Sequence, residues 1–190
     1  MYKKLVAAGL ALAALTFAPY AADAAKSGNE IRVEDRCEPV SFNIAIGPGT
    51  CVGGGTTTFD EFLEELNPVD FGDDHWRFQA SGSSIKRGQS IKVVNNGGEF
   101  HTFTEVANFG GGCVDLLNGA LGLTPVPECE PLLPSPDPQT DPPTPPTPVA
   151  FVTTGLPPLG GTLTVTPTTK GTHHYICLIH PWMRTDVVVQ

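Results

Sequence analysis

Positively charged residues are scarce in this chain of 190 residues. It has 11 Lys and Arg against 20 Asp and Glu, which gives a formal net charge of −9 at pH 7. Nucleic acids and anionic membrane surfaces attract basic proteins, so this balance argues against both as partners. An acidic surface instead favours a basic partner protein.

Long hydrophobic runs are absent after the first 25 residues. Residues 1–24 begin with Lys3 and Lys4, continue with an apolar run at 5–18, and end in Ala-Asp-Ala, which is the pattern of a secretory signal peptide. The run is short for a membrane span, and no cysteine lies near the cleavage point to carry a lipid. We expect a soluble mature protein, periplasmic or secreted, without membrane insertion. Removal of the signal makes the net charge one unit more negative.

Sequence signatures of several enzyme classes are also missing. The chain contains no Gly-x-Ser-x-Gly, the turn that presents a nucleophilic serine. Its Gly-rich runs lack the lysine of a phosphate-binding loop. Hydrolase and nucleotide-binding chemistry therefore have no support in the sequence.

Cysteines are few and odd in number: Cys37, Cys51, Cys113, Cys129 and Cys177. Disulfides persist in exported proteins, and four cysteines pair in three possible ways. The local pairings Cys37–Cys51 and Cys113–Cys129 are favoured, because each closes a short loop. Cys177 remains, either as a free buried thiol or as a sulfur with another task.

The first part of the mature chain predicts little regular structure. Residues 30–34 alternate polar and apolar, as a short strand does. Residues 46–55 are Gly-rich and predict a loop. In residues 58–66, Thr58 and Glu61 have the spacing of a capping box, which predicts a two-turn helix that stops at Pro68. We assign residues 25–73 to an N-terminal extension with a short helix, packed on the main domain.

Residues 74–190 predict an all-β domain. Short runs rich in Val, Thr, Ile and aromatics are separated by Gly and Asn turns, which is typical of a β-sandwich or barrel. The expected strands cover residues 75–79, 90–95, 99–106, 161–167, 172–178 and 185–190.

Residues 107–150 interrupt this domain as a Pro-rich insertion. Within it, residues 131–148 are so rich in proline that they fit neither a helix nor a central strand. We expect an extended surface loop or tether there, and an inert spacer is favoured over a recognition segment. A short helix is expected at residues 114–121.

Three soft or borderline metal ligands lie close together near the C-terminus: Cys177, His180 and Met183. Copper that cycles between two oxidation states favours two imidazoles and a thiolate in a plane, with a weak thioether on the axis. A second histidine must come from upstream. His101, at the start of a strand after a Gly turn, is the candidate.

These residues carry a resemblance to a known family. The Cys-x-x-His-x-x-Met loop, with Pro181 and Trp182 before Met183, resembles that of the amicyanins, and the turn Asn-Asn-Gly-Gly-Glu-Phe-His resembles the first-ligand region of cupredoxins. The resemblance covers residues 75–190, less the insertion. It implies a Greek-key β-sandwich with one type 1 (blue) copper per chain, held by His101, Cys177, His180 and Met183.

The resemblance also implies how the two histidines are held. The residue after the first histidine is often Asn in the family and pins the two ligand loops together; here it is Thr102, whose hydroxyl can act similarly. By the same resemblance, His101 is buried and held by backbone. His180 is expected to reach the surface, ringed by Pro181 and Trp182, as the port for electrons.

Other residues near these ligands have simpler interpretations. His75 is expected to be structural. His173, Tyr175 and Cys177 alternate onto one face of a strand and His174 onto the other, so both histidines are expected to occupy ordinary strand positions. Glu99 is close to His101, and a solvated turn carboxylate is favoured for it. Taken singly, Cys177 and Met183 are also compatible with core packing.

The resemblance implies an electron carrier rather than an enzyme. Copper oxidases need further histidines, including ones beside the ligating Cys, but Ile176 and Leu178 flank Cys177 and no His-x-His pair exists. Four ligands leave no open position for a substrate. We expect a monomer that exchanges electrons with a redox partner protein of basic character. The alternatives are a copper delivery or storage protein, and an interaction module that works through the Pro-rich insertion.

Overall fold

The computed structural model describes residues 29–69, 71–80, 84–129 and 153–190. The predicted signal peptide, residues 1–24, and the Pro-rich run, residues 131–148, lie outside these ranges. Among the described residues, no helix combines the length and the apolar character that a membrane crossing requires.

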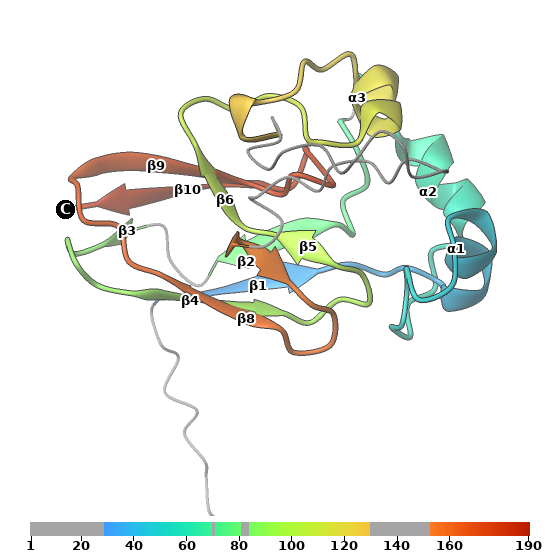
Figure 1. The fold of residues 1–190 in the computed structure, drawn as a ribbon, viewed down its shortest axis with the longest axis horizontal. Helices are drawn as coiled ribbons and strands as arrows, with labels where there is room; N and C mark the ends of the chain where they lie inside the picture. Colours follow the sequence, from blue (N-terminus) through green and yellow to red (C-terminus); the bar gives the residue numbers. More distant parts are fainter. Residues whose placement is uncertain (1–28, 70, 81–83, 130–152) are drawn as a thin grey trace, which may run out of the picture.

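One four-stranded sheet contains β1 (Glu30–Glu34), which comes from the expected N-terminal extension, beside strands of the expected β-domain (Figure 1). Its strands lie in the order β2 (Arg77–Ala80), β1, β4 (Ile91–Asn95) and β8 (Thr162–Val165). β1 pairs antiparallel with β2 and parallel with β4, so it is an inner strand of a mixed sheet. The expected boundary at residue 73 therefore runs through this sheet, because β1 lies on one side of it and β2 and β4 on the other.

A second four-stranded sheet carries the C-terminal part of the chain. Its strands lie in the order β3 (Ser84–Ile85), β10 (Arg184–Val189), β9 (Gly171–Ile176) and β6 (Thr104–Val106). β9 and β10 pair antiparallel, with Ile176 opposite Arg184, so residues 177–183 connect them as a loop. β5 (His101–Thr102) pairs separately with β7 (Gly155–Leu156).

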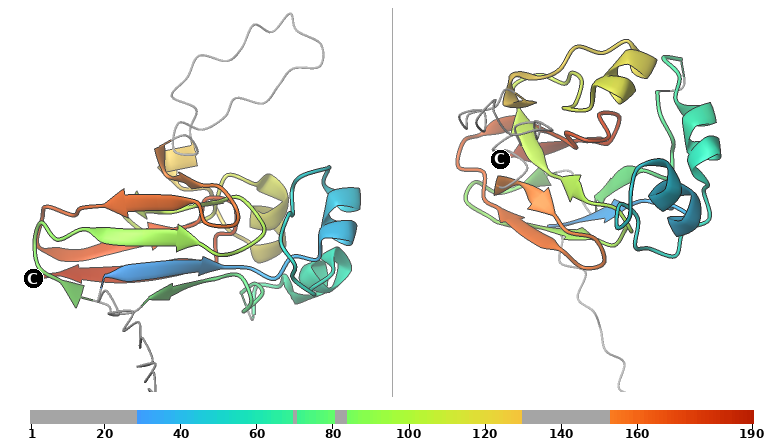
Figure 2. Two further views of the ribbon diagram at one scale, coloured as in Figure 1. Left: turned by 90° about the horizontal axis from the view of Figure 1, so that it is seen from below. Right: turned by 45° about the vertical axis from the view of Figure 1, so that its right-hand side comes forward.

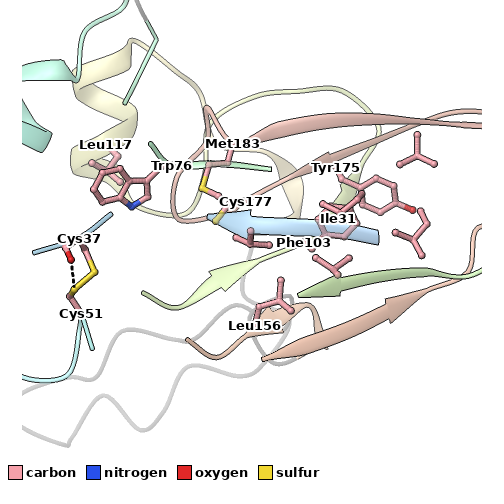
Figure 3. Close-up of a cluster of buried hydrophobic side chains, with 14 of the residues drawn as sticks. Ile31, Cys37, Cys51, Trp76, Phe103, Leu117, Leu156, Tyr175, Cys177 and Met183 are labelled. Carbon is pink, nitrogen blue, oxygen red and sulfur yellow. Dashed lines mark hydrogen bonds between the residues drawn. A yellow bond between two sulfur atoms is a disulfide. The ribbon is translucent and has the colours of Figure 1, made fainter. Parts of the chain in front are cut away.

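The core lies between the two sheets (Figure 3). In β1, Ile31 and Val33 are buried and Arg32 between them is exposed, as the two-residue period of a strand requires. From the other side, Phe103 stacks on Tyr175 with ring centroids 4.3 Å apart. Each fully buried large apolar side chain contributes about 1.5–3 kcal/mol, so this layer holds the sheets together.

Three helices of the described residues lie at one end of the sheets, away from the C-terminus (Figures 1 and 2). They are α1 (Pro39–Ala45), α2 (Phe59–Glu65) and α3 (Asp115–Leu121), and the short 3-10 helix η1 (Pro127–Cys129) lies apart from them. α2 begins with the predicted capping box between Thr58 and Glu61. We refer to residues 37–69, which hold α1 and α2, as the N-terminal cover.

Backbone contacts attach the N-terminal cover to the sheets, and the Cys37–Cys51 disulfide crosslinks the cover internally. The predicted disulfides Cys37–Cys51 and Cys113–Cys129 are both present. The Val52 amide donates to the Gly98 carbonyl at 2.9 Å. Gly53 and Gly98 pass so closely that a Cβ on Gly98 would lie 2.5 Å from the Gly53 nitrogen. Glycine is needed there because no side chain fits between the two segments.

Most of the expected elements are present, with differences at short ones. The first strand has the predicted bounds, and a helix occupies residues 115–121 as expected. The strand expected at 99–106 is divided into β5 and β6 at Phe103. α1, β3 and β7 were not predicted, because two-residue strands and a seven-residue helix that begins at Pro39 carry too little periodicity.

Candidate metal centre

The fold brings together His101, Cys177 and His180 from two places in the sequence. Their ligand atoms lie within 4.8 Å of one another, and all three residues are buried. His101 begins β5, directly after the turn that follows β4. Cys177 and His180 lie in the loop between β9 and β10, which ends on the same side as the helices (Figure 1).

The ring nitrogens of both histidines face the cysteine sulfur. The Cys177 Sγ lies 3.7 Å from His101 Nδ1 and 3.9 Å from His180 Nδ1. Two donors that are each about 2.0–2.3 Å from one ion, at about 120° to each other, lie about 3.7 Å apart. The spacing therefore matches two edges of a trigonal metal site.

Hydrogen bonds fix Cys177 from several directions. The Thr102 amide points at the Cys177 sulfur at 3.5 Å, and the Thr102 hydroxyl oxygen accepts from the Leu178 amide at 2.8 Å. The hydroxyl thus joins the two ligand segments, as predicted. Within the loop, the Cys177 amide donates to the Met183 carbonyl at 3.0 Å and the Met183 amide donates to the His180 carbonyl at 2.9 Å. The protein's own hydrogen bonds therefore hold the ligand segments together.

The surroundings of Cys177 favour its thiolate. Burial raises the pKa of a thiol, but hydrogen bonds and charge from His101 and His180 outweigh burial and hold the pKa of Cys177 well below its ordinary value. The thiolate is the form that binds metals. Cys177 is the free cysteine left by the two disulfides, so its sulfur is available as a ligand.

A carboxylate holds the first histidine. His101 Nε2 donates to Asp35 Oδ2 at 2.9 Å, and the side chains of both residues are at most 1% exposed. Asp35 also accepts from the amides of Gly98 at 2.9 Å and Glu99 at 3.0 Å. Because Nε2 carries the proton, Nδ1 presents its lone pair toward Cys177. The resemblance implied a backbone partner here, and the structure corrects it to a side chain.

This pair changes the pKa of both members. Burial alone raises the pKa of Asp35, but the hydrogen bond and charge of His101 and the two amides lower it to about 2. Burial alone lowers the pKa of His101, but its bonds to Asp35 and Cys177 raise it to about 10.

His180 is not at the surface, contrary to expectation. It is 3% exposed, and Pro181 is buried as well. The ring of His180 lies against Phe62 of α2, with centroids 6.2 Å apart, and against Trp182 at 5.4 Å. The N-terminal cover buries His180 through Phe62. The cover lies outside the part of the chain that resembles cupredoxins, so the resemblance could not predict this burial.

Glu99 is buried beneath the same cover. It is 4% exposed, so the expectation of a solvated turn carboxylate is wrong. Its Oε2 accepts from Trp76 Nε1 at 2.6 Å and lies 3.7 Å from His180 Nε2, beyond hydrogen-bond distance. Burial raises the pKa of Glu99. Trp76 thus fixes a carboxyl group beside the second histidine.

Met183 is buried in the same region, at 1% exposure. Figure 3 shows its side chain beside Cys177. Its role as an axial ligand stays a prediction.

The remaining candidates have other partners. His173 and His174 lie on β9 as expected. His173 contacts Glu105 on β6 at 2.7 Å, and His174 contacts Asp186 on β10 at 2.6 Å. His75 pairs with Asp73 at 2.9 Å. A further group, Asp35, Cys37 and Glu99, has close ligand atoms, but the Cys37 sulfur is in a disulfide and Asp35 is bound to His101. These residues therefore do not make a second metal site.

The donor set fits copper. Two imidazoles and a thiolate, buried together and fixed by hydrogen bonds, are the planar ligands of blue copper sites. Sequence reasoning found these three residues but missed Asp35, Phe62 and Trp76, which surround them. Asp35 is one of 20 acidic residues with no local pattern, and only the folded chain shows that it reaches His101.

Comparison with known proteins gives matches among solved structures only. No protein-family model and no curated protein matches the sequence. A purple cupredoxin from Nitrosopumilus maritimus is similar over 66% of this chain and 95% of its own, with 16% identity and a TM-score of 0.36. Reduced amicyanin variants are similar over 56% of this chain and 67% of their own, with 20% identity and a TM-score of 0.30. Because these identities and scores are low, the choice of metal rests on the donor set.

Proposed function

We propose that this chain is an exported one-electron carrier with one type 1 copper, bound by His101, Cys177, His180 and Met183. The observation that carries the proposal is the arrangement of two buried imidazole nitrogens at 3.7 Å and 3.9 Å from one buried cysteine sulfur. Copper bound there supplies a single electron through its Cu(II) and Cu(I) states.

The protein's own groups explain why such a site transfers electrons well. Asp35 holds the His101 ring through Nε2, and Thr102 contacts both the Cys177 sulfur and the following amide. Ligands held in this way move little when the charge of the metal changes. Met183 is proposed as the weak axial ligand that adjusts the reduction potential.

A carrier is favoured over an enzyme because of the number of donors and their burial. Four protein ligands leave no open position at the metal, in contrast to catalytic sites. His101, Cys177, His180 and Met183 are each at most 3% exposed, which limits the approach of a substrate.

The broader features of the proposal follow the sequence. The mixed sheets with few helices support a cupredoxin-like sandwich, and Greek-key connectivity is part of the proposal. The two disulfides support a non-cytoplasmic location, and we propose the periplasm or the exterior. We propose a monomer that exchanges electrons with a partner protein.

Voltammetry of the copper-loaded protein tests the function. A carrier gives a reversible one-electron couple and keeps its copper in the presence of a metal-free acceptor. Met183→Leu should raise the potential and keep the couple reversible. An irreversible couple together with rapid loss of copper to the acceptor would instead support the alternative, copper delivery or storage.

A further inference from the structure

An apolar groove leads from the surface to His180. It has a volume of about 400 Å³ and runs between α1, α2 and α3. Phe42 and Phe62 come from the N-terminal cover, Leu117 comes from α3, and His180 and Glu99 lie at the inner end. The groove therefore lets a molecule outside the protein approach the second histidine.

Large apolar side chains stand exposed along this groove. Ile46 is 56% exposed, Leu63 39% and Leu116 70%, and all three line it. They come from the loop after α1, from α2 and from α3. Apolar residues gathered on one face of a water-soluble domain mark an interaction site more often than isolated ones do.

Exposed carboxylates accompany the apolar residues on the same helices. Asp60, Glu64 and Glu65 lie on α2, and Asp115 precedes Leu116 on α3. Neither residues 37–76 nor residues 93–169 contain a Lys or Arg. The groove therefore has an acidic border and no cationic residue in its lining.

Basic residues concentrate at other places. Lys86, Arg87 and Lys170 lie near the start of β9 and the end of β3, at the end of the sheets away from the helices (Figure 1). Arg36 and Arg77 line a separate polar hollow with Glu34. The helices α1, α2 and α3 thus contain no Lys or Arg, α2 and α3 carry carboxylates, and the groove runs between the three helices.

We propose that this groove is the docking surface for a basic redox protein that presents an apolar patch ringed by lysine or arginine. This inference rests on the proposed function. The acidic border attracts and orients such a partner, and the apolar floor lets it approach His180 without direct exposure of the ring. The N-terminal cover and α3 replace the exposed histidine edge as the port for electrons.

Because His180 is buried, the place where a partner docks decides how closely it approaches the ring. Trp182, which does not line the groove, lies against the ring on another side, so a partner that docks there remains separated from His180 by this side chain. Contacts of this kind are small and brief, as redox encounters require. Charge attraction sets the association rate and makes it depend on salt.

The first test maps the contact on the metal-free protein, so it does not depend on copper. The isotope-labelled protein is titrated with a lysine-rich c-type cytochrome in its reduced state, and amide NMR shifts are recorded. We expect shifts for residues 44–66 and 114–117 and none near Lys86 or Lys170. Shifts elsewhere, or none, would overturn the proposal. If the groove residues shift with the concentration of the protein itself, a second copy of the chain occupies the groove, and this result would also overturn the proposal.

The second test measures electron transfer from the reduced copper protein to the oxidised form of the same cytochrome by stopped flow. Glu64→Gln with Glu65→Gln should lower the rate constant about 3- to 10-fold at low salt and flatten its salt dependence. The matched control is Glu30→Gln with Asp186→Asn, an equal change of charge away from the groove. Equal effects of the two pairs would contradict the proposal.

The apolar contribution has its own pair of variants. Leu116→Ser should lower the rate at all salt concentrations, while Val188→Ser on β10, 38% exposed, should not. If the copper protein gives a reversible couple at an electrode but the variants show none of these differences, the docking surface is wrong and the proposed function stands. If the protein gives no reversible couple, the proposed function itself is wrong.

Discussion

The loop between β9 and β10 and the N-terminal cover serve the same site in different ways. The loop places Cys177, His180 and the proposed axial ligand Met183 within seven residues, so the sequence itself displays these candidate donors. The cover contributes no donor, yet it buries His180, and Asp35 just before it holds His101 across 66 positions of sequence. The candidate ligands after β9 are thus encoded locally, whereas the approach of His101 and the surroundings of the site depend on the tertiary fold.

Removal of the central side chain of the cover should have the largest effect on stability. Phe62 is buried among Phe42, Trp76 and His180, so Phe62→Ala should cost about 3–5 kcal/mol of unfolding free energy. The Cu(II) absorption band should persist because no donor is lost, and small reductants should reach the site faster. Chemical denaturation and stopped-flow reduction measure the two effects. Loss of the band in a folded variant would contradict a separation between donors and cover.

The Cys37–Cys51 disulfide of the cover and the Cys113–Cys129 disulfide should differ in how they shield the copper site. Cys37→Ala with Cys51→Ala opens a loop of 14 residues and should cost about 3 kcal/mol in thermal unfolding. Cys113→Ala with Cys129→Ala, with a separation of 16, should cost about as much. Only the first pair should speed the reduction of copper by small reagents. Equal acceleration by both pairs would mean that the cover has no particular part in shielding the site.

Asp35 links the two regions, and its effect depends on pH. The pKa of Asp35 is lowered to about 2 from 3.8, so it stabilises the folded metal-free protein above pH 3.8. That contribution, about 2 kcal/mol, is lost as the pH falls through 3.8 toward 2. In Asp35→Asn the contribution should be absent at every pH. Urea unfolding of the metal-free protein from pH 6 to pH 2 shows the difference.

The same variant should weaken metal binding. Loss of the carboxylate that orients a histidine ligand typically lowers metal affinity about 10- to 100-fold. Copper affinity of Asp35→Asn can be measured by competition with a chelator, with Asp186→Asn as the control. Unchanged affinity would show that Asp35 matters for the fold alone.

The smallest effect concerns the start of α2. Thr58 accepts from the Glu61 amide, and Glu61 accepts from the Thr58 amide at 2.8 Å. Thr58→Ala should cost about 1 kcal/mol, with Thr56→Ala as an exposed control in the same segment. The copper spectrum should not change in either variant. A spectral change would mean that the position of α2 controls the ligands and not only their shielding.

The sequence predicted what local patterns encode. Alternation in β1 and β9, the spacing of Cys177, His180 and Met183, and the place of His101 after a Gly turn are all visible without a fold. Thr102 was predicted to join the ligand loops, and its hydroxyl does accept from the Leu178 amide.

The surroundings of the site could not be predicted in the same way. Phe62 was recognised as part of a helix face, but nothing in a two-turn helix indicates which surface it packs on. The family resemblance starts at residue 75, so the expectation of an exposed His180 took no account of the cover. Glu99 was assigned to solvent because it lies in a turn, whereas Trp76 and the cover bury it in the folded chain.

The most direct test of the account is the visible absorption spectrum of the protein with added Cu(II), recorded beside Cys177→Ser. The account predicts an intense blue band from thiolate to copper in the natural protein, bleached by reductant and lost in the variant. A colourless protein, or colour that survives Cys177→Ser, would contradict the blue copper site.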